Sequence, residues 1–441
     1  MIYKYDFRYS IVKLFVDAAL RLNFKKLIVT GKENIPHDLP VVFTPNHRNA
    51  LIDALLVVYA NKQHRQVVFL ARGDIFKKPF IAWILRGMRL IPVFRIRDGK
   101  ESLDKNGEIF DVAGKVLKNK NPLALFPEAA HNPKQSLLPL QKAVPRIVLP
   151  VEAQHDFRLN SQIVPVSIYY TDLTGFLRDC FVHFGKPIPV AAYREMYAEN
   201  PNLSINKLRS DLEIKLREMV VDIWNDEYYE MYKSYIDWNR EEISIREYPD
   251  EKDAEVKAAQ QIVKTIDHLY ENDPAEFERK KSDFEEATKI SKDHDLRSTD
   301  KLLKPESTFR LILKYLLLTI TFPVALFGFI NGVFPILFYK RLLKLFKDKQ
   351  FTATVRYVVG LAFVPAFDVI QTLLAKAIFH DWNIALAYFA AMPLSFLFAV
   401  HWRRKAKSVN RQWRVNRFVK HFPKTWDKLV KLIAIPPREM P

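Results

Sequence analysis

The pattern of hydrophobic and polar positions changes twice along the chain. Up to about residue 190, short apolar runs alternate with amphipathic stretches, whereas the chain after about residue 204 is charged, with helical spacing. From about residue 308, long apolar runs dominate. Short runs rich in β-branched and aromatic residues predict strands, and the stretches between them predict helices. The first part is therefore expected to be an α/β sandwich.

The expected domain boundaries follow from this pattern. The α/β domain covers residues 1–203, and a charged helical segment with a polar linker follows at 204–307, with a helix beginning near NDPAEF at 272–277. A membrane region is expected at 308–400 and a basic tail at 401–441. Strands of the first domain are expected at Lys26–Thr30, Val41–Thr44, Val67–Ala71, Leu90–Phe94, Leu123–Phe126, Ile163–Tyr169 and Phe181–Phe184.

Three apolar runs indicate the membrane region. Tyr315–Tyr339 and Ile384–Val400 contain no formal charge, and Tyr357–Ala375 contains one acid. About 20 residues at a rise of 1.5 Å match a hydrocarbon core of roughly 30 Å. We expect transmembrane helices at about 357–378 and 384–400; buried helices of a soluble domain are the alternative.

Charge is distributed unevenly and indicates what the basic residues bind. Residues 225–300 hold 22 acidic and 12 basic residues, whereas residues 401–441 hold 12 basic and 2 acidic residues. The basic tail directly follows an apolar run, where cations meet anionic lipid headgroups. Membrane lipids are therefore the expected partner of the net charge of +18, rather than nucleic acid.

The topology of the first apolar run follows from the rule that basic loops of membrane proteins lie on the cytoplasmic side. Residues 340–356 carry six basic residues and one acid, so both this segment and the tail are expected on the cytoplasmic side. A single crossing would separate this segment from a cytoplasmic N-terminal domain. Because prolines, glycines and an asparagine interrupt the run repeatedly, we expect a re-entrant hairpin at about 315–339.

Candidate chemistry begins where an apolar strand ends, in VVFTPNHRNALIDALL at 41–56. His47 lies on the turn, and Asn49 is a natural N-cap that places Asp53 in the first helical turn, within reach of the imidazole. A carboxylate on one ring nitrogen fixes the tautomer, while the other nitrogen accepts a proton. By itself, this spacing fits a helix cap beside an incidental histidine better than a general-base dyad.

Further sequence motifs favour the general-base dyad over the incidental histidine. They resemble the motifs of the PlsC-like glycerolipid acyltransferases, which act on glycerol-3-phosphate and 1-acylglycerol-3-phosphate. The resemblance covers roughly residues 25–190 and includes the turn with Asn46, His47 and Asp53. Its later blocks are RLIPVFR at 89–95, FPEAAH at 126–131 and IVPVSI at 163–168, with Pro165.

The chain departs from the family pattern at several positions. Arg89 and Ala129 stand where glycine is usual, and His131 stands where an arginine often helps to bind phosphate. Five residues separate His47 from Asp53, where bacterial members usually have four.

The resemblance implies that His47 and Asp53 are catalytic and that Arg95, Glu128, His131 and Lys142 bind substrate. A glycerol phosphate is a dianion, and the guanidinium of Arg95 can bind it bidentately, whereas Lys142 acts as a point charge and His131 must be protonated. Glu128 is expected to orient the substrate hydroxyl or the neighbouring backbone.

The expected function is direct transfer of a fatty acyl chain from acyl-CoA or acyl carrier protein to a glycerol phosphate, without a cofactor. A zinc site at His47, His64 and His131 does not match a standard ligand spacing, and Cys180 lies in an apolar strand. We expect an integral protein of a bacterial inner membrane, with its catalytic domain on the cytoplasmic face. The alternative is a noncatalytic membrane scaffold or lipid-binding module with an acyltransferase-like fold.

Overall fold

The computed structural model describes residues 6–61, 65–77, 79–93, 111–296, 300, 303, 305–346, 348 and 351–435. The chain divides into two compact units. The first comprises Met1–Asp222 together with Phe346–Tyr357, and the second comprises Ile223–Leu345 and Val358–Pro441.

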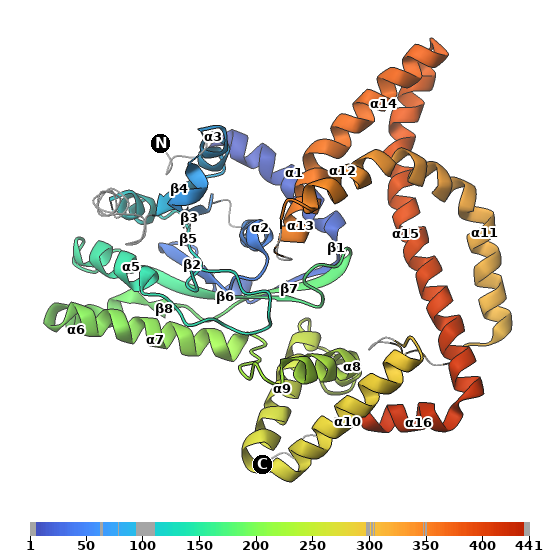
Figure 1. Ribbon diagram of the computed structural model, residues 1–441. Helices are drawn as coiled ribbons and strands as arrows, with labels where there is room; N and C mark the ends of the chain where they lie inside the picture. The colour runs from blue at the N-terminus through green and yellow to red at the C-terminus, as the bar shows by residue number, and fades with distance from the viewer. Residues whose placement is uncertain are drawn as a thin grey trace. The chain divides into compact units, whose positions relative to one another are not determined.

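The first unit is built on one sheet in the order β1-β7-β6-β2-β5-β3-β4, with β8 also paired to β6 (Figure 1). Its strands are β1 Phe24–Thr30, β2 Val41–Pro45, β3 Val68–Arg72, β4 Leu90–Val93, β5 Leu123–Ala124, β6 Gln162–Tyr170, β7 Arg178–Phe184 and β8 Ile188–Pro189. β6, β2, β5, β3 and β4 are parallel neighbours, whereas β7 and β8 pair with β6 in the antiparallel sense. All the expected strands are present, and β8 is additional.

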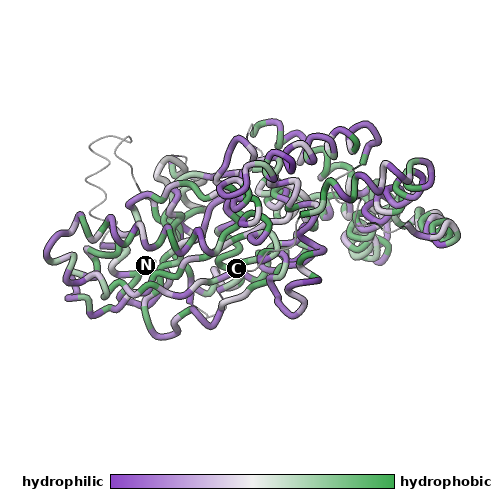
Figure 2. Tube along the Cα trace, turned by 90° about the horizontal axis from the view of Figure 1, so that it is seen from below, coloured by the Kyte–Doolittle hydropathy of each residue, from purple (hydrophilic) through white to green (hydrophobic). Residues whose placement is uncertain are grey.

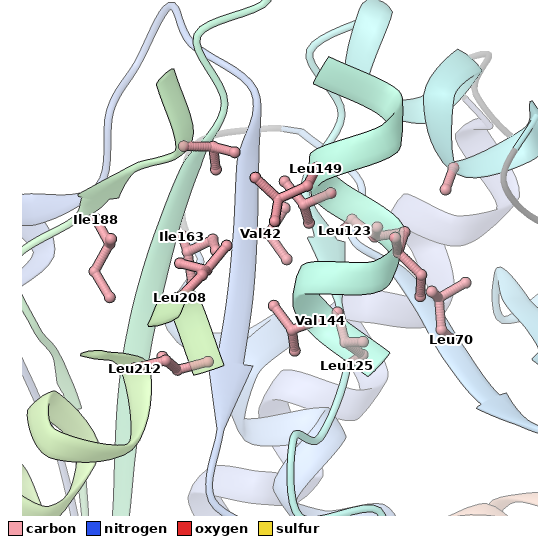
Figure 3. Close-up of a cluster of buried hydrophobic side chains, with 14 of the residues drawn as sticks. Val42, Leu70, Leu123, Leu125, Val144, Leu149, Ile163, Ile188, Leu208 and Leu212 are labelled. Atoms are coloured by element: carbon pink, nitrogen blue, oxygen red, sulfur yellow. The ribbon is translucent and has the colours of Figure 1, made fainter. Parts of the chain in front are cut away.

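Helices cover both faces of this sheet. Val42, Leu123 and Ile163 pack against α5 (Ala143–Ala153) and α7 (Pro201–Met219) in one apolar core (Figure 3). Ile163 and Tyr170 are an odd number of positions apart in β6, so their side chains point to opposite faces. Asp53 of α2 (Ala50–Ala60) binds Tyr170, which places α2 on the face opposite α5 and α7. Figure 2 shows hydrophilic residues along the outer loops.

The first unit extends to Asp222, beyond the expected end of the α/β domain at residue 203. The reason is α7, whose Leu208, Leu212 and Leu216 repeat every fourth position and are buried in the core. The other helices of this unit are α1 Phe7–Asn23, α3 Pro79–Gly87, α6 Arg194–Glu199 and the helical residues 111–118.

The second unit is helical in the part of it that the structure describes. Its charged half contains α8 Tyr229–Glu247, α9 Ala254–Asn272 and α10 Pro274–Asp293. α10 begins where NDPAEF predicted, and the side chain of Asp273 accepts a hydrogen bond of 3.0 Å from the backbone of Glu276. The apolar half contains α11 Thr308–Asn331, α12 Val333–Leu343, α14 Val364–Phe379, α15 Trp382–His421 and α16 Pro423–Leu432. α13 (Phe351–Val358) starts in the first unit and continues into a π-helical turn at Val359–Phe363.

Three stretches of the described chain are helical, long and apolar enough to cross a membrane: Thr308–Asn331, Phe351–Phe379 and Trp382–His421. They support membrane association. Pro323 lies inside α11 without ending it, and the chain breaks instead at Gly332. α11 packs closely on α15, because a Cβ at Gly328 would lie 2.1 Å from the carbonyl oxygen of Ser395. The re-entrant path of this run stays a prediction.

Candidate active site

The carboxyl ends of β2, β5 and β6 meet at one edge of the sheet, because these strands are parallel neighbours. The turn after β2 is held to β6 by Asn46. Its backbone N–H donates to the carbonyl of Val166 at 3.2 Å. Its side-chain amide donates to the carbonyl of Ile168 at 3.2 Å and accepts from the N–H of Ile168 at 2.7 Å. These bonds fix the position from which His47 projects.

The structure brings His47 and Asp53 together. Nδ1 of His47 lies 2.9 Å from Oδ2 of Asp53, which is completely buried. The same oxygen accepts the backbone N–H groups of Arg48 at 2.7 Å and of Asn49 at 2.6 Å. The other oxygen, Oδ1, accepts the hydroxyl of Tyr170 at 2.5 Å. The carboxylate of Asp53 is therefore bound by four donors.

The start of α2 is organised differently from the expected cap. The helix begins after Asn49, as predicted, but the side chain of Asn49 makes no capping hydrogen bond and donates to the carbonyl of Leu173 at 3.2 Å. Asp53 caps the turn instead, by accepting the N–H groups that precede the helix. A carboxylate in the first turn is also favoured by the helix dipole.

Electrostatics keep Asp53 ionised. Burial opposes its charge, but the hydrogen bond and the charge of His47, the N–H of Asn49 and the hydroxyl of Tyr170 together hold its pKa below the ordinary value. Burial and the neighbouring carboxylate raise the pKa of Tyr170 well above its usual range, so Tyr170 stays protonated and donates. Because an ionised carboxylate only accepts, Nδ1 of His47 carries a proton and Nε2 is left as the base.

Glu128 supports the backbone of His47. Its two carboxylate oxygens accept the N–H of His47 at 2.6 Å and the N–H of Leu138 at 2.9 Å. The backbone N–H of Asn132 donates to the carbonyl of His47 at 2.9 Å. Burial raises the pKa of Glu128 to about 7, although both N–H donors favour its ionised form. Of the two roles expected for Glu128, these contacts match orientation of the neighbouring backbone.

Two rings that follow β5 contact the imidazole of His47. Phe126 stacks on it, with ring centroids 3.7 Å apart and an interplanar angle of 14°. The ring of His131 lies 4.0 Å away at 46°. His131 is half-buried, so it is part of the immediate surroundings of the base.

The other predicted site residues are not seen in contact with His47. Arg95 and His64 lie outside the described residues. Lys142 is exposed at the N-cap position of α5, and the contacts described for it do not reach His47. In the described part of the chain, no group of three His, Cys, Asp or Glu side chains could hold a metal ion.

Tyr170 is the main residue of the site that the sequence did not identify. It ends β6 four positions beyond Val166, and β6 is paired with β2. The signal was present in QIVPVSIYY, where a tyrosine ends the strand that contains Pro165, but it pointed to the site only once the strand order was known.

Two of the family's glycine positions have left-handed backbone here. Arg89 has a φ of 60° and Ala129 a φ of 54°. Glycine adopts this conformation without a steric penalty, whereas a residue with a Cβ is strained by about 1–2 kcal/mol. Both substitutions therefore keep the backbone shape at the cost of local strain.

Comparisons with known proteins bear on the family of this part of the chain. Residues 26–169 match the family model described as Acyltransferase. These residues therefore match an acyltransferase domain, as the sequence motifs predicted.

Individual relatives are more distant. The chain is 26% identical to glycerol-3-phosphate O-acyltransferase 2 of Saccharomyces cerevisiae over 41% of its length, and 29% identical to 1-acyl-sn-glycerol-3-phosphate acyltransferase of Borreliella burgdorferi over 33%. The matched regions span 24% and 52% of these two relatives. The crystal structure of the acyltransferase PlsC from Thermotoga maritima aligns over 48% of this chain and 77% of its own, at 21% identity and a TM-score of 0.33.

The strain at Ala129 is testable by Ala129→Gly. Removing the Cβ relieves about 1–2 kcal/mol of strain, and the greater freedom of glycine in the unfolded chain offsets about 0.4–1 kcal/mol of this. We expect a modest rise in the thermal unfolding temperature of the purified protein. The control is Ala130→Gly, which lies outside the left-handed positions and should lower that temperature. Equal effects of both changes would contradict the strain at Ala129.

The ionised state of Asp53 predicts how stability depends on pH. Because its folded pKa is below its unfolded value, near 3.9, its contribution is present above that value and is lost as the pH falls through the folded pKa. We expect Asp53→Asn to lower the free energy of unfolding by roughly 2 kcal/mol at pH 7. Urea unfolding of both proteins should show the difference shrinking below about pH 4. A difference that grows on acidification would rule out an ionised Asp53.

Proposed function

We propose that the protein transfers a fatty acyl chain from a thioester to the hydroxyl of glycerol-3-phosphate or 1-acylglycerol-3-phosphate, with His47 as the general base. The observation that carries this proposal is the 2.9 Å contact between His47 and a buried Asp53, whose pKa is held below its ordinary value by His47 first and then by Asn49 and Tyr170. This arrangement orients the imidazole and stabilises its charged form when it takes up a proton.

The reaction proceeds by direct transfer. Nε2 of His47 accepts the proton of the acceptor hydroxyl as its oxygen attacks the thioester carbonyl carbon. A new C–O bond forms, the C–S bond breaks, and the departing thiolate takes the proton from the imidazolium of His47. Asp53 stabilises the imidazolium between these two proton transfers, while Tyr170 and the turn N–H groups hold Asp53 in place.

The acceptor class rests on the family and on the relatives, which are named for glycerol-3-phosphate and 1-acylglycerol-3-phosphate. Arg95, which follows β4 in the chain, is proposed as the main phosphate ligand, with Lys142 and His131 as further cations. The acyl donor is proposed to be acyl-CoA or acyl carrier protein, since no covalent enzyme intermediate is required.

The membrane setting is part of the same proposal. The three apolar helices and the basic residues of 340–356 and 401–441 support an integral membrane protein of a bacterial inner membrane. In this topology, the basic segments and the acyltransferase domain share the cytoplasmic face, and α11 with α12 returns to the side from which it entered.

Replacement of His47 tests the reaction. His47→Ala should lower kcat/KM at least about a thousandfold without changing the unfolding temperature by more than a few degrees, because the general base and its tautomer control are lost. The assay follows a labelled acyl chain to a panel of phosphorylated glycerols, using full-length protein in detergent. His37→Ala, at an exposed histidine of the same unit, is the matched control and should keep activity. Transfer by the unchanged protein to none of these acceptors would refute the proposed substrate.

Cysteine labelling tests the topology. The native Cys180 is completely buried, so a cysteine introduced at an exposed site gives the labelling signal. In intact cells, Leu345→Cys should resist a membrane-impermeant maleimide, whereas His380→Cys, in the link between α14 and α15, should be labelled. External labelling at position 345 would place that segment outside and refute the re-entrant path.

A further inference from the structure

The segment Phe346–Tyr357 is distant in sequence from the acyltransferase domain, which matches the family model only up to residue 169, yet it belongs to the same compact unit. Its helical part begins at Phe351, the first residue of the 29-residue stretch that is apolar enough to cross a membrane. Residues 346–357 are called the juxtamembrane segment below.

Two neighbouring side chains fasten the juxtamembrane segment to the catalytic unit. Arg356 donates to the carbonyl oxygens of Thr174 at 3.0 Å and Gly175 at 2.7 Å, and its guanidinium lies 5.4 Å from the ring centroid of Phe176. The buried hydroxyl of Tyr357 donates to the carbonyl oxygen of Val16 in α1 at 2.8 Å. Bonds to two separate elements fix both the position and the rotation of the first turns of this helix.

The other end of the juxtamembrane segment reaches the surroundings of His47. The ring of Phe351 meets the ring of His131 edge to face, with centroids 6.0 Å apart, and His131 in turn lies 4.0 Å from His47. Phe346 packs on Phe351 at 5.5 Å and is 44% exposed. A pair of aromatic rings therefore lies one side chain away from the imidazole, and one of the two has open surface.

We propose that Phe346 and Phe351 form a binding surface for the acyl chain of the thioester donor. This inference rests on the proposed function, in which the thioester carbonyl must lie beside the hydroxyl that His47 activates. The methylenes attached to that carbonyl then start next to His131 and need apolar surface. Two phenylalanine rings supply it, and one of them, Phe351, begins a helical stretch apolar enough to cross a membrane.

The inference predicts a dependence on chain length. With full-length protein in detergent and saturating acceptor, Phe351→Ala should lower kcat/KM about tenfold for a palmitoyl thioester and less than about twofold for a butyryl thioester, because only the long chain loses ring contact. Phe334→Ala is the control, since Phe334 is an exposed phenylalanine of α12 outside the juxtamembrane segment, and both rates should be unchanged.

A second variant leaves both rings in place. Tyr357→Phe removes only the bond to Val16, which loosens the juxtamembrane segment, so the palmitoyl preference should fall by less than in Phe351→Ala.

An equal loss for both thioesters in Phe351→Ala would show that Phe351 only supports His131, and the inference would be overturned. If the loss of activity in Phe351→Ala depended instead on the length of the acyl chain of a 1-acyl acceptor, the two rings would be assigned to binding of the acceptor chain. Absence of transfer by the unchanged protein with either thioester would overturn the proposed function, and the inference with it.

Discussion

The buried carboxylate of Asp53 is the constraint on which the rest of the catalytic unit depends. A charged group without exposure is tolerated only when hydrogen bonds replace its water, and Asp53 meets this requirement with donors from His47, the turn before α2 and Tyr170. Three of the four donors lie in the turn after β2 and the fourth, Tyr170, ends β6, so the carboxylate is satisfied only if β2 and β6 are neighbours in the observed register. The same bonds that keep Asp53 charged therefore fix the tautomer of His47 and join two strands of the sheet.

The parallel order of the strands explains why the site lies at the carboxyl edge of the sheet. β2, β5 and β6 are parallel, so the chain leaves all three at the same edge, and their following residues come within hydrogen-bond distance. Glu128 uses this proximity to hold the N–H of His47, and Asn46 uses it to bind Ile168. These contacts orient the backbone so that only Nε2 of His47 remains for chemistry.

The sequence predicted the elements well because their signals are local. The strands, the start of α10 and the position of Asp53 in the first turn of α2 each depend on a few consecutive residues. Tyr170 was not predicted, because it lies 117 residues from Asp53 and its role depends on strand order, which hydrophobic periodicity does not determine. The capping side chain was assigned to Asn49 for a related reason: propensity favours asparagine as a cap, but the carbonyl of Leu173, far along the chain, competes for its amide. The charges of α7 favoured its assignment to the helical segment after residue 203, whereas its buried every-fourth residue joins it to the compact first unit.

At Arg89 and Ala129 the backbone is left-handed, although neither residue is the glycine that adopts this conformation without strain. Ala129 follows Glu128, whose carboxylate must reach the N–H of His47 while the next residues turn the chain back toward Asn132. A right-handed residue at 129 would redirect this loop and remove either the bond from Glu128 or the bond from Asn132 to His47. Strain of about 1–2 kcal/mol is no larger than the loss of one such hydrogen bond, because leaving a buried polar group without its partner costs about 1–3 kcal/mol. The backbone therefore stays left-handed at Ala129. Because the same loop carries His131, this backbone conformation also positions the ring of His131 that Phe351 contacts.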